Sequence, residues 1–159
     1  MAAASGLGKL KVFEAAPELL ALLLEVPAES RREVGLALAR LLGAEVRYIQ
    51  LSRALSADPG TALAQEMEAL RTRRRKSFPQ LQTVAGDLVA ARDEFSAGNL
   101  DSASRSFLRA VDSLTANEVS PYCREILAEC AGRMREFGSS RLEYALLACL
   151  VIERCGKAP

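Results

Sequence analysis

Apolar residues recur along the chain at spacings of three and four, which is the pattern of a helix with one buried face. No comparable stretch alternates between apolar and polar residues, as a half-buried strand would. Glycine or proline interrupts the pattern roughly every fifteen to twenty residues, and each interruption marks the end of one helix and the start of the next. The pattern therefore predicts an all-α fold of about seven to eight helices.

The first half of the chain is predicted to hold short helices separated by proline and glycine. Pro17 and Pro27 suit the first position of a helix, because a backbone amide there would have no partner within the helix. Gly43 suits the C-terminal cap of the helix that Pro27 begins. The predicted helices cover residues 17–26, 27–42 and 44–56, and a fourth begins near Thr61, after the Asp58-Pro59-Gly60 turn, and ends in the basic run before residue 77.

The second half is predicted to hold two helix pairs, each joined by a tight turn that contains glycine. Gly98 lies in the first turn and Gly138 in the second. Ser140 and Glu143 have the spacing of a capping box, in which each side chain bonds to the backbone amide of the other residue. The predicted helices cover residues 79–95, 101–115, 121–137 and 141–154.

Small and aromatic residues in the first of these pairs fall at a recognisable spacing. They are Ala91, Gly98, Ala103, Phe107 and Ala110, and the pair resembles a tetratricopeptide repeat, in which small residues let two antiparallel helices approach and an aromatic ring fills the space beside them. A second, looser copy continues to Cys155, so the resemblance covers residues 81–155. It implies a right-handed superhelix of antiparallel hairpins at residues 79–159, on which the helices of residues 1–76 pack.

The resemblance also implies a binding function, because stacked helix pairs of this family form a concave groove that accepts a peptide or a partner's helix. Members that bind the acidic ends of chaperones carry Lys and Asn where this chain has Leu88 and Arg92, so that particular site is not implied, but Leu88 is still predicted to line the groove and contact a partner. Arg92 and Arg133 are candidates for contact with an acidic partner, and the alternative is that both are solvated surface residues.

The last predicted helix carries an apolar face that needs a cover. Leu146, Leu147 and Leu150 lie on it. If the N-terminal helices cover it, the chain is a self-sufficient adaptor or scaffold. If a partner covers it, the chain is a regulatory subunit or the N-terminal region of a larger assembly. The sequence accordingly predicts either a monomer or a subunit of a hetero-complex.

Charge narrows the choice of partner. The chain has 21 basic and 20 acidic residues, a balance that argues against a general nucleic-acid surface. Its apolar runs are shorter than the roughly 20 residues that span a bilayer, so no membrane insertion is expected and the chain is placed in the cytoplasm or nucleus. One basic run has three interpretations: the end of a helix, a nuclear import signal or a contact with an anionic partner. Ser77, which follows this run, is a candidate phosphorylation site. The run consists of Arg71, Arg73, Arg74, Arg75 and Lys76.

The residues that support catalysis are scarce. The chain has no histidine, and no carboxylate pair lies in an apolar stretch that would raise its pKa. It has no glycine-rich phosphate loop. Its four cysteines lie in helical segments without a Cys-x-x-Cys pair, so buried free thiols are expected in place of a metal site, and the alternative is a disulfide or a redox role. We therefore expect a non-catalytic protein without a cofactor or metal.

Overall fold

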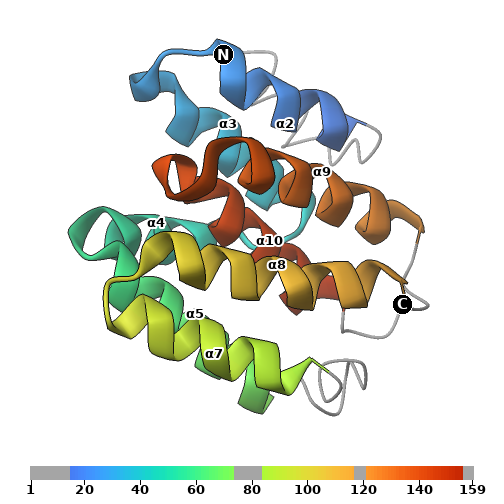
Figure 1. The fold of residues 1–159 in the computed structure, drawn as a ribbon. Helices are drawn as coiled ribbons and strands as arrows, with labels where there is room; N and C mark the ends of the chain where they lie inside the picture. Colours follow the sequence, from blue (N-terminus) through green and yellow to red (C-terminus); the bar gives the residue numbers. More distant parts are fainter. Residues whose placement is uncertain (1–14, 74–83, 117–120, 156–159) are drawn as a thin grey trace. The chain divides into compact units, whose positions relative to one another are not determined.

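The computed structural model describes residues 15–73, 84–116 and 121–155, and within these ranges the fold is all-α, as predicted (Figure 1). No strand occurs in the described ranges. The eight α-helices of this part are α2 (Ala16–Glu25), α3 (Ala28–Leu41), α4 (Glu45–Ala57), α5 (Pro59–Arg73), α7 (Ala85–Ser96), α8 (Leu100–Ala116), α9 (Pro121–Phe137) and α10 (Glu143–Cys155), and a short 3-10 helix, η2 (Gly138–Arg141), joins the last two.

The helix boundaries agree with the predicted ones to within about two residues in most places. Helix α5 begins at Pro59, ahead of the predicted Thr61. Asp58 explains the difference, since its carboxylate accepts the Thr61 backbone amide at 3.2 Å and the Thr61 hydroxyl at 2.8 Å. This N-cap supports a helix that starts at the proline itself. The prediction that α7 starts at Pro79 is wrong, because this helix begins at Ala85, directly after the non-helical Val84. Pro79 itself lies outside the described residues.

The predicted capping box ahead of α10 is wrong. Ser140 lies within η2, and its hydroxyl donates to the Phe137 carbonyl oxygen at 2.6 Å. Glu143 is the first residue of α10 and pairs with Arg141. The chain leaves α9 through Gly138, whose φ is 57°, and turns Ser140 back toward the carbonyl groups that the end of α9 leaves unbonded.

The chain divides into two compact units, Met1–Gln50 and Leu51–Pro159. The division falls within α4, whereas the predicted one at residues 76–79 lies outside the described residues, so α5 groups with the C-terminal helices. In the first unit α2 packs on α3. Gly35 of α3 makes room for an aromatic ring there, because a Cβ atom at this position would lie 2.0 Å from the Tyr48 hydroxyl oxygen.

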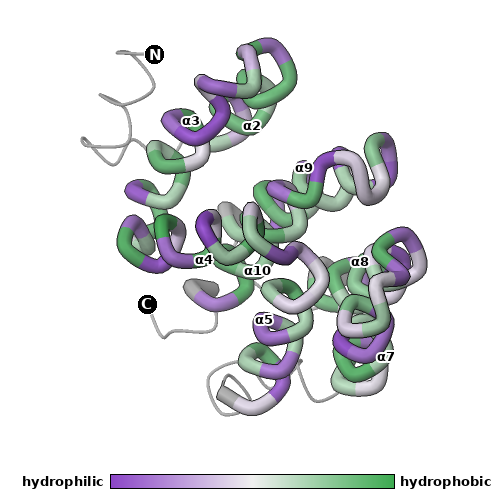
Figure 2. The backbone as a smooth tube through the Cα atoms, turned by 90° about the vertical axis from the view of Figure 1, so that its left-hand side faces the viewer, coloured by the Kyte–Doolittle hydropathy of each residue, from purple (hydrophilic) through white to green (hydrophobic). Residues whose placement is uncertain are grey.

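The helices of the second unit form two layers. Helices α7, α8 and α9 lie side by side in one layer, and α5 and α10 lie behind it in the view of Figure 1; Figure 2 shows the same arrangement from the side. Helix α5 packs on α7, and α10 packs on α9. Helix α5 also contacts α10, so the first and last complete helices of the unit meet. In an open array of repeats each element contacts only its neighbours.

The residues that carry the tetratricopeptide resemblance lie in the core. Ala91, Ala103, Phe107 and Ala110 are completely buried, and Gly98 turns the chain between α7 and α8 with φ of 83°. The second hairpin is buried in the same manner, at Leu127, Cys130, Ala131, Met134, Ala145, Cys149 and Ile152. The predicted helical hairpins are thus present, while their assembly as a right-handed superhelix stays a prediction.

Candidate protein-interaction surface

The four leucines predicted to contact a partner are all buried. Leu88 of α7 and Leu146, Leu147 and Leu150 of α10 are at most 2% exposed. Helix α10 is buried on every side from Tyr144 to Ile152, and α9 and α5 both contact it. These leucines are therefore parts of the core and are not accessible to a partner in this conformation.

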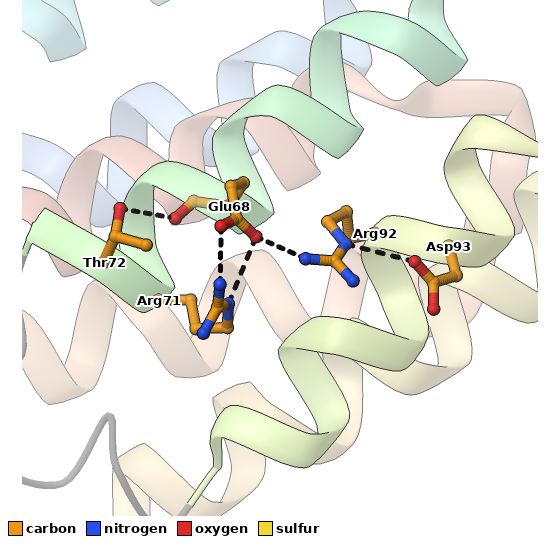
Figure 3. A network of polar contacts seen from close by, with 5 residues as sticks. All are labelled: Glu68, Arg71, Thr72, Arg92 and Asp93. Carbon is orange, nitrogen blue, oxygen red and sulfur yellow. Dashed lines mark hydrogen bonds and ion pairs between the residues drawn. The ribbon is translucent and has the colours of Figure 1, made fainter.

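The two candidate arginines are partly buried, and each is paired with carboxylates of its own chain. Arg92 of α7 bonds to Glu68 of α5 at 2.6 Å and to Asp93 at 3.1 Å (Figure 3). Arg133 of α9 lies 3.8 Å from Glu129 and 3.6 Å from Glu136. An acidic partner would have to compete with these carboxylates for either guanidinium.

Arg71, the first residue of the predicted basic run, belongs to the same network as Arg92. Its guanidinium donates two hydrogen bonds to the Glu68 carboxylate, at 3.1 and 2.6 Å (Figure 3). The Thr72 hydroxyl donates to the backbone carbonyl of Glu68 at 2.9 Å. The rest of the run, which comprises the side chain of Arg73 and residues Arg74, Arg75 and Lys76, lies outside the described residues, as does Ser77.

Glu68 is the centre of this network because it accepts from two helices. Hydrogen bonds from Arg71 and then Arg92 lower its pKa to about 2. The same bonds raise the pKa of both guanidinium groups. The carboxylate therefore stays ionised, and it links the last turns of α5 to the middle of α7 throughout the physiological pH range.

The pKa of Glu68 predicts a stability difference that depends on pH. Because this pKa is lower in the folded chain than in the unfolded one, ionised Glu68 stabilises the fold above a pH of about 4.5, and the contribution is lost as the pH falls toward 2. The stability advantage of the wild type over Glu68→Gln is thus expected to be full near neutral pH and to shrink in acid. Urea denaturation at several pH values measures it.

A suitable control for this measurement is Glu33→Gln, which removes an exposed carboxylate of α3 without touching the bond between α5 and α7. A gap between wild type and Glu68→Gln that stays constant down to pH 2 would show that the network does not hold the carboxylate ionised.

The bond between Glu68 and Arg92 is one of three similar ion pairs, each of which bridges successive helices. In every case the carboxylate lies on the earlier helix, and the arginine follows 22 to 24 residues later on the next one. We name this set the ion-pair ladder; it consists of Glu68–Arg92 between α5 and α7, Asp87–Arg109 between α7 and α8, and Asp112–Arg135 between α8 and α9. This ladder could have been found in the sequence, because the separation of 22 to 24 residues between carboxylate and arginine is about the length of one helix and the turn that follows it.

The ladder pairs are accessible to solvent, with every side chain at least about one third exposed except that of Arg92, which falls just below this. Ion pairs at the surface contribute little to the free energy of unfolding. Replacing the partner of a ladder residue by a charged group of another protein therefore costs little stability. Arginine also presents a planar group that forms paired hydrogen bonds with carboxylates. The ladder therefore offers partly exposed groups of both charges on successive helices.

The cysteines differ in part from the prediction. Cys130 and Cys149 are buried thiols, as expected, and burial, aided by the charge of Glu129, raises the pKa of Cys130 to about 12. A thiol with so high a pKa is a poor nucleophile. The prediction of a free thiol is wrong for Cys123, which is disulfide-bonded. The side chain of Cys155 lies outside the described residues.

Two further features of the described residues bear on the kind of site. No three histidine, cysteine or acidic side chains there come together in a group that could hold a metal ion. None of the helices described is both long and apolar enough to traverse a bilayer. Comparison of the chain with protein-family models, with curated proteins and with solved structures found no match.

Proposed function

We propose that this chain is a non-catalytic helical adaptor that binds a protein partner through the polar surface of α7 and α8. The observation that carries the proposal is the ion-pair ladder, which places accessible arginine and carboxylate groups on successive packed helices. Arginine is enriched in protein interfaces, and mixed charges on a rigid surface select partners by complementary charge. The partner is accordingly a protein with a mixed-charge surface.

The alternative function is a regulatory subunit whose partner covers the final helix. This alternative requires an apolar face of α10 that is exposed in the isolated chain. Leu146, Leu147 and Leu150 are buried, so this support is absent and the adaptor is favoured.

A photo-reactive amino acid at Arg105 tests the adaptor proposal in cells. Arg105 is exposed on α8, one turn before Arg109 of the ladder. We expect a covalent adduct with one protein from this position, and we expect Arg109→Glu to remove most of it by reversing a ladder charge. The same group at Glu33, an exposed residue of α3, serves as the control position and is expected to give no such adduct.

Three outcomes of this experiment would sink the proposal. One is the absence of any adduct at position 105 in cells that contain the chain. Another is an adduct that forms equally well in the Arg109→Glu variant. The third is an adduct that Arg32→Glu, a matched change at an exposed arginine of α3, removes to the same extent.

We place the adaptor in the cytoplasm or nucleus, the nucleus being its compartment if the basic run of Arg71, Arg73, Arg74, Arg75 and Lys76 is an import signal. The disulfide at Cys123 is an observation against this placement, because disulfides are rare in reducing compartments. Cells can be quenched in acid and the thiols then labelled with a mass tag. The proposed placement requires this disulfide to be reduced in the cell, so that all four cysteines of the chain are tagged. A smaller number would assign the protein to an oxidising one.

A further inference from the structure

Helix α9 has one face that is exposed along its length and carries charges in two rows. Arg124 and Arg135 are separated by about three turns of helix and so share one edge of this face. Glu125 and Glu136 share the other edge for the same reason. Ala128 and Gly132 lie one turn apart between the two edges. All six residues are exposed, and together we name them the α9 face.

The centre of the α9 face carries only small residues, and packing among the described residues does not explain the glycine there. A Cβ atom at Gly132 would meet nothing within 4 Å, so no neighbour among the described residues requires a glycine there. Glycine inside a helix is less favourable than alanine, because it loses more backbone entropy on folding. A second helix, however, could approach Gly132 and Ala128 closely.

We propose that the α9 face is a self-association surface, on which two copies of this chain pair through parallel α9 helices around a two-fold axis. In this arrangement the arginine edge of one copy lies against the glutamate edge of the other. Arg124 would meet Glu125 of the second copy, and Arg135 would meet Glu136 of the second copy, each contact occurring twice.

The charge rows also decide the direction of the second helix. In an antiparallel pair with two-fold symmetry, the arginine edges would face each other, and so would the glutamate edges. Like charges in such positions repel, so the charges favour the parallel arrangement and disfavour the antiparallel one. The self-complementary pattern of the α9 face is thus the argument for a second copy as the occupant.

The expected pair is weak. A single helix face covers less than the roughly 800 Å² per partner of a standard stable interface. Arg135 also bonds to Asp112 of its own chain, but both side chains are about half exposed, so this arginine can be shared with a second carboxylate. The proposal does not rest on the adaptor function, because it concerns a different face and a different partner.

Sedimentation velocity of the whole chain from micromolar to millimolar concentration tests the proposal. We expect the mass to rise from monomer toward dimer across this range. Gly132→Leu, which fills the centre of the face, is expected to weaken self-association by about tenfold or more. Gly86→Leu is the matched control, since Gly86 of α7 is also an exposed helical glycine with nothing within 4 Å of its Cβ position, and it is expected to leave the dimer unchanged.

A charge exchange tests the parallel arrangement itself. Glu136→Arg and Arg135→Glu are each expected to weaken self-association, because each places like charges across one end of the interface. An equimolar mixture of the two variants is expected to restore pairing, as heterodimers, since two arginines then face two glutamates. Circular dichroism of each variant confirms that it is folded.

Three results would overturn the proposal. The wild type could remain a monomer at every concentration. Its dimer could survive Gly132→Leu as well as it survives Gly86→Leu. The mixture of charge variants could pair no better than either variant alone.

Discussion

Replacing Leu150 with glutamate is expected to abolish the cooperative unfolding of the chain. Leu150 is completely buried in α10, which is itself buried on every side. A carboxylate there would lie away from solvent, in a site shaped for a leucine side chain. Burial of such a charge is among the changes that lower the free energy of unfolding by more than about 4 kcal/mol. This loss approaches the whole stability of an ordinary domain, about 5–15 kcal/mol. Thermal melting followed by circular dichroism measures it.

Val46→Glu is the control for this experiment. Val46 of α4 is 70% exposed, so a charge at this position is expected to change stability by no more than about 0.5 kcal/mol. If Leu150→Glu melted like the wild type and lost only a binding partner, α10 would be a docking surface after all. The regulatory-subunit function would then replace the adaptor.

Gly60→Ala is expected to destabilise the second unit by about 1–3 kcal/mol. Gly60 lies in the first turn of α5, where a Cβ atom would come within 2.5 Å of the backbone carbonyl oxygen of Phe95 in α7. A backbone atom cannot turn aside as a flexible side chain does. Relief of the clash requires α7 to shift, and Phe95 would move with it out of the core it fills.

Gly86→Ala provides a close comparison, because Gly86 lies at the same position in the first turn of α7, and nothing surrounds its Cβ position. This substitution is expected to stabilise the chain by about 0.5–1 kcal/mol through the reduced entropy of the unfolded state. Urea denaturation gives both free energies. Equal stability of the two variants would show that α5 and α7 do not approach as closely as described.

Several features of the fold could be predicted from the sequence because they depend on local chemistry. Gly98 and Gly138 end helices with positive φ, a conformation that glycine adopts without strain. Phe107 is buried, as its spacing from Ala103 and Ala110 indicated. Features that depend on how distant helices meet could not be predicted in this way, since the contact between α5 and α10 has no counterpart in local spacing.

Two features of the candidate site were not predicted correctly: the burial of the α10 leucines and the ion-pair ladder. Residues 145–152 are apolar without interruption, and a helix that is apolar on all sides is buried on all sides. The three- and four-residue spacing of its leucines alone indicates only one apolar face for this helix. The ion-pair ladder was missed because its residues appear separately as ordinary helix charges. Their regular separation of 22 to 24 residues becomes visible only when adjacent helices are aligned.

The contact between α5 and α10 has a consequence for synthesis of the protein on the ribosome. Helix α10 is the last helix described in the second unit, yet α5, one of the first in that unit, packs on it. During translation α5, α7 and α8 emerge before the helix that completes their core, and exposed apolar surface of this kind favours aggregation. The core of the second unit therefore cannot close before α10 has been synthesised, and slow translation of the intervening segment would prolong the exposure of α5, α7 and α8.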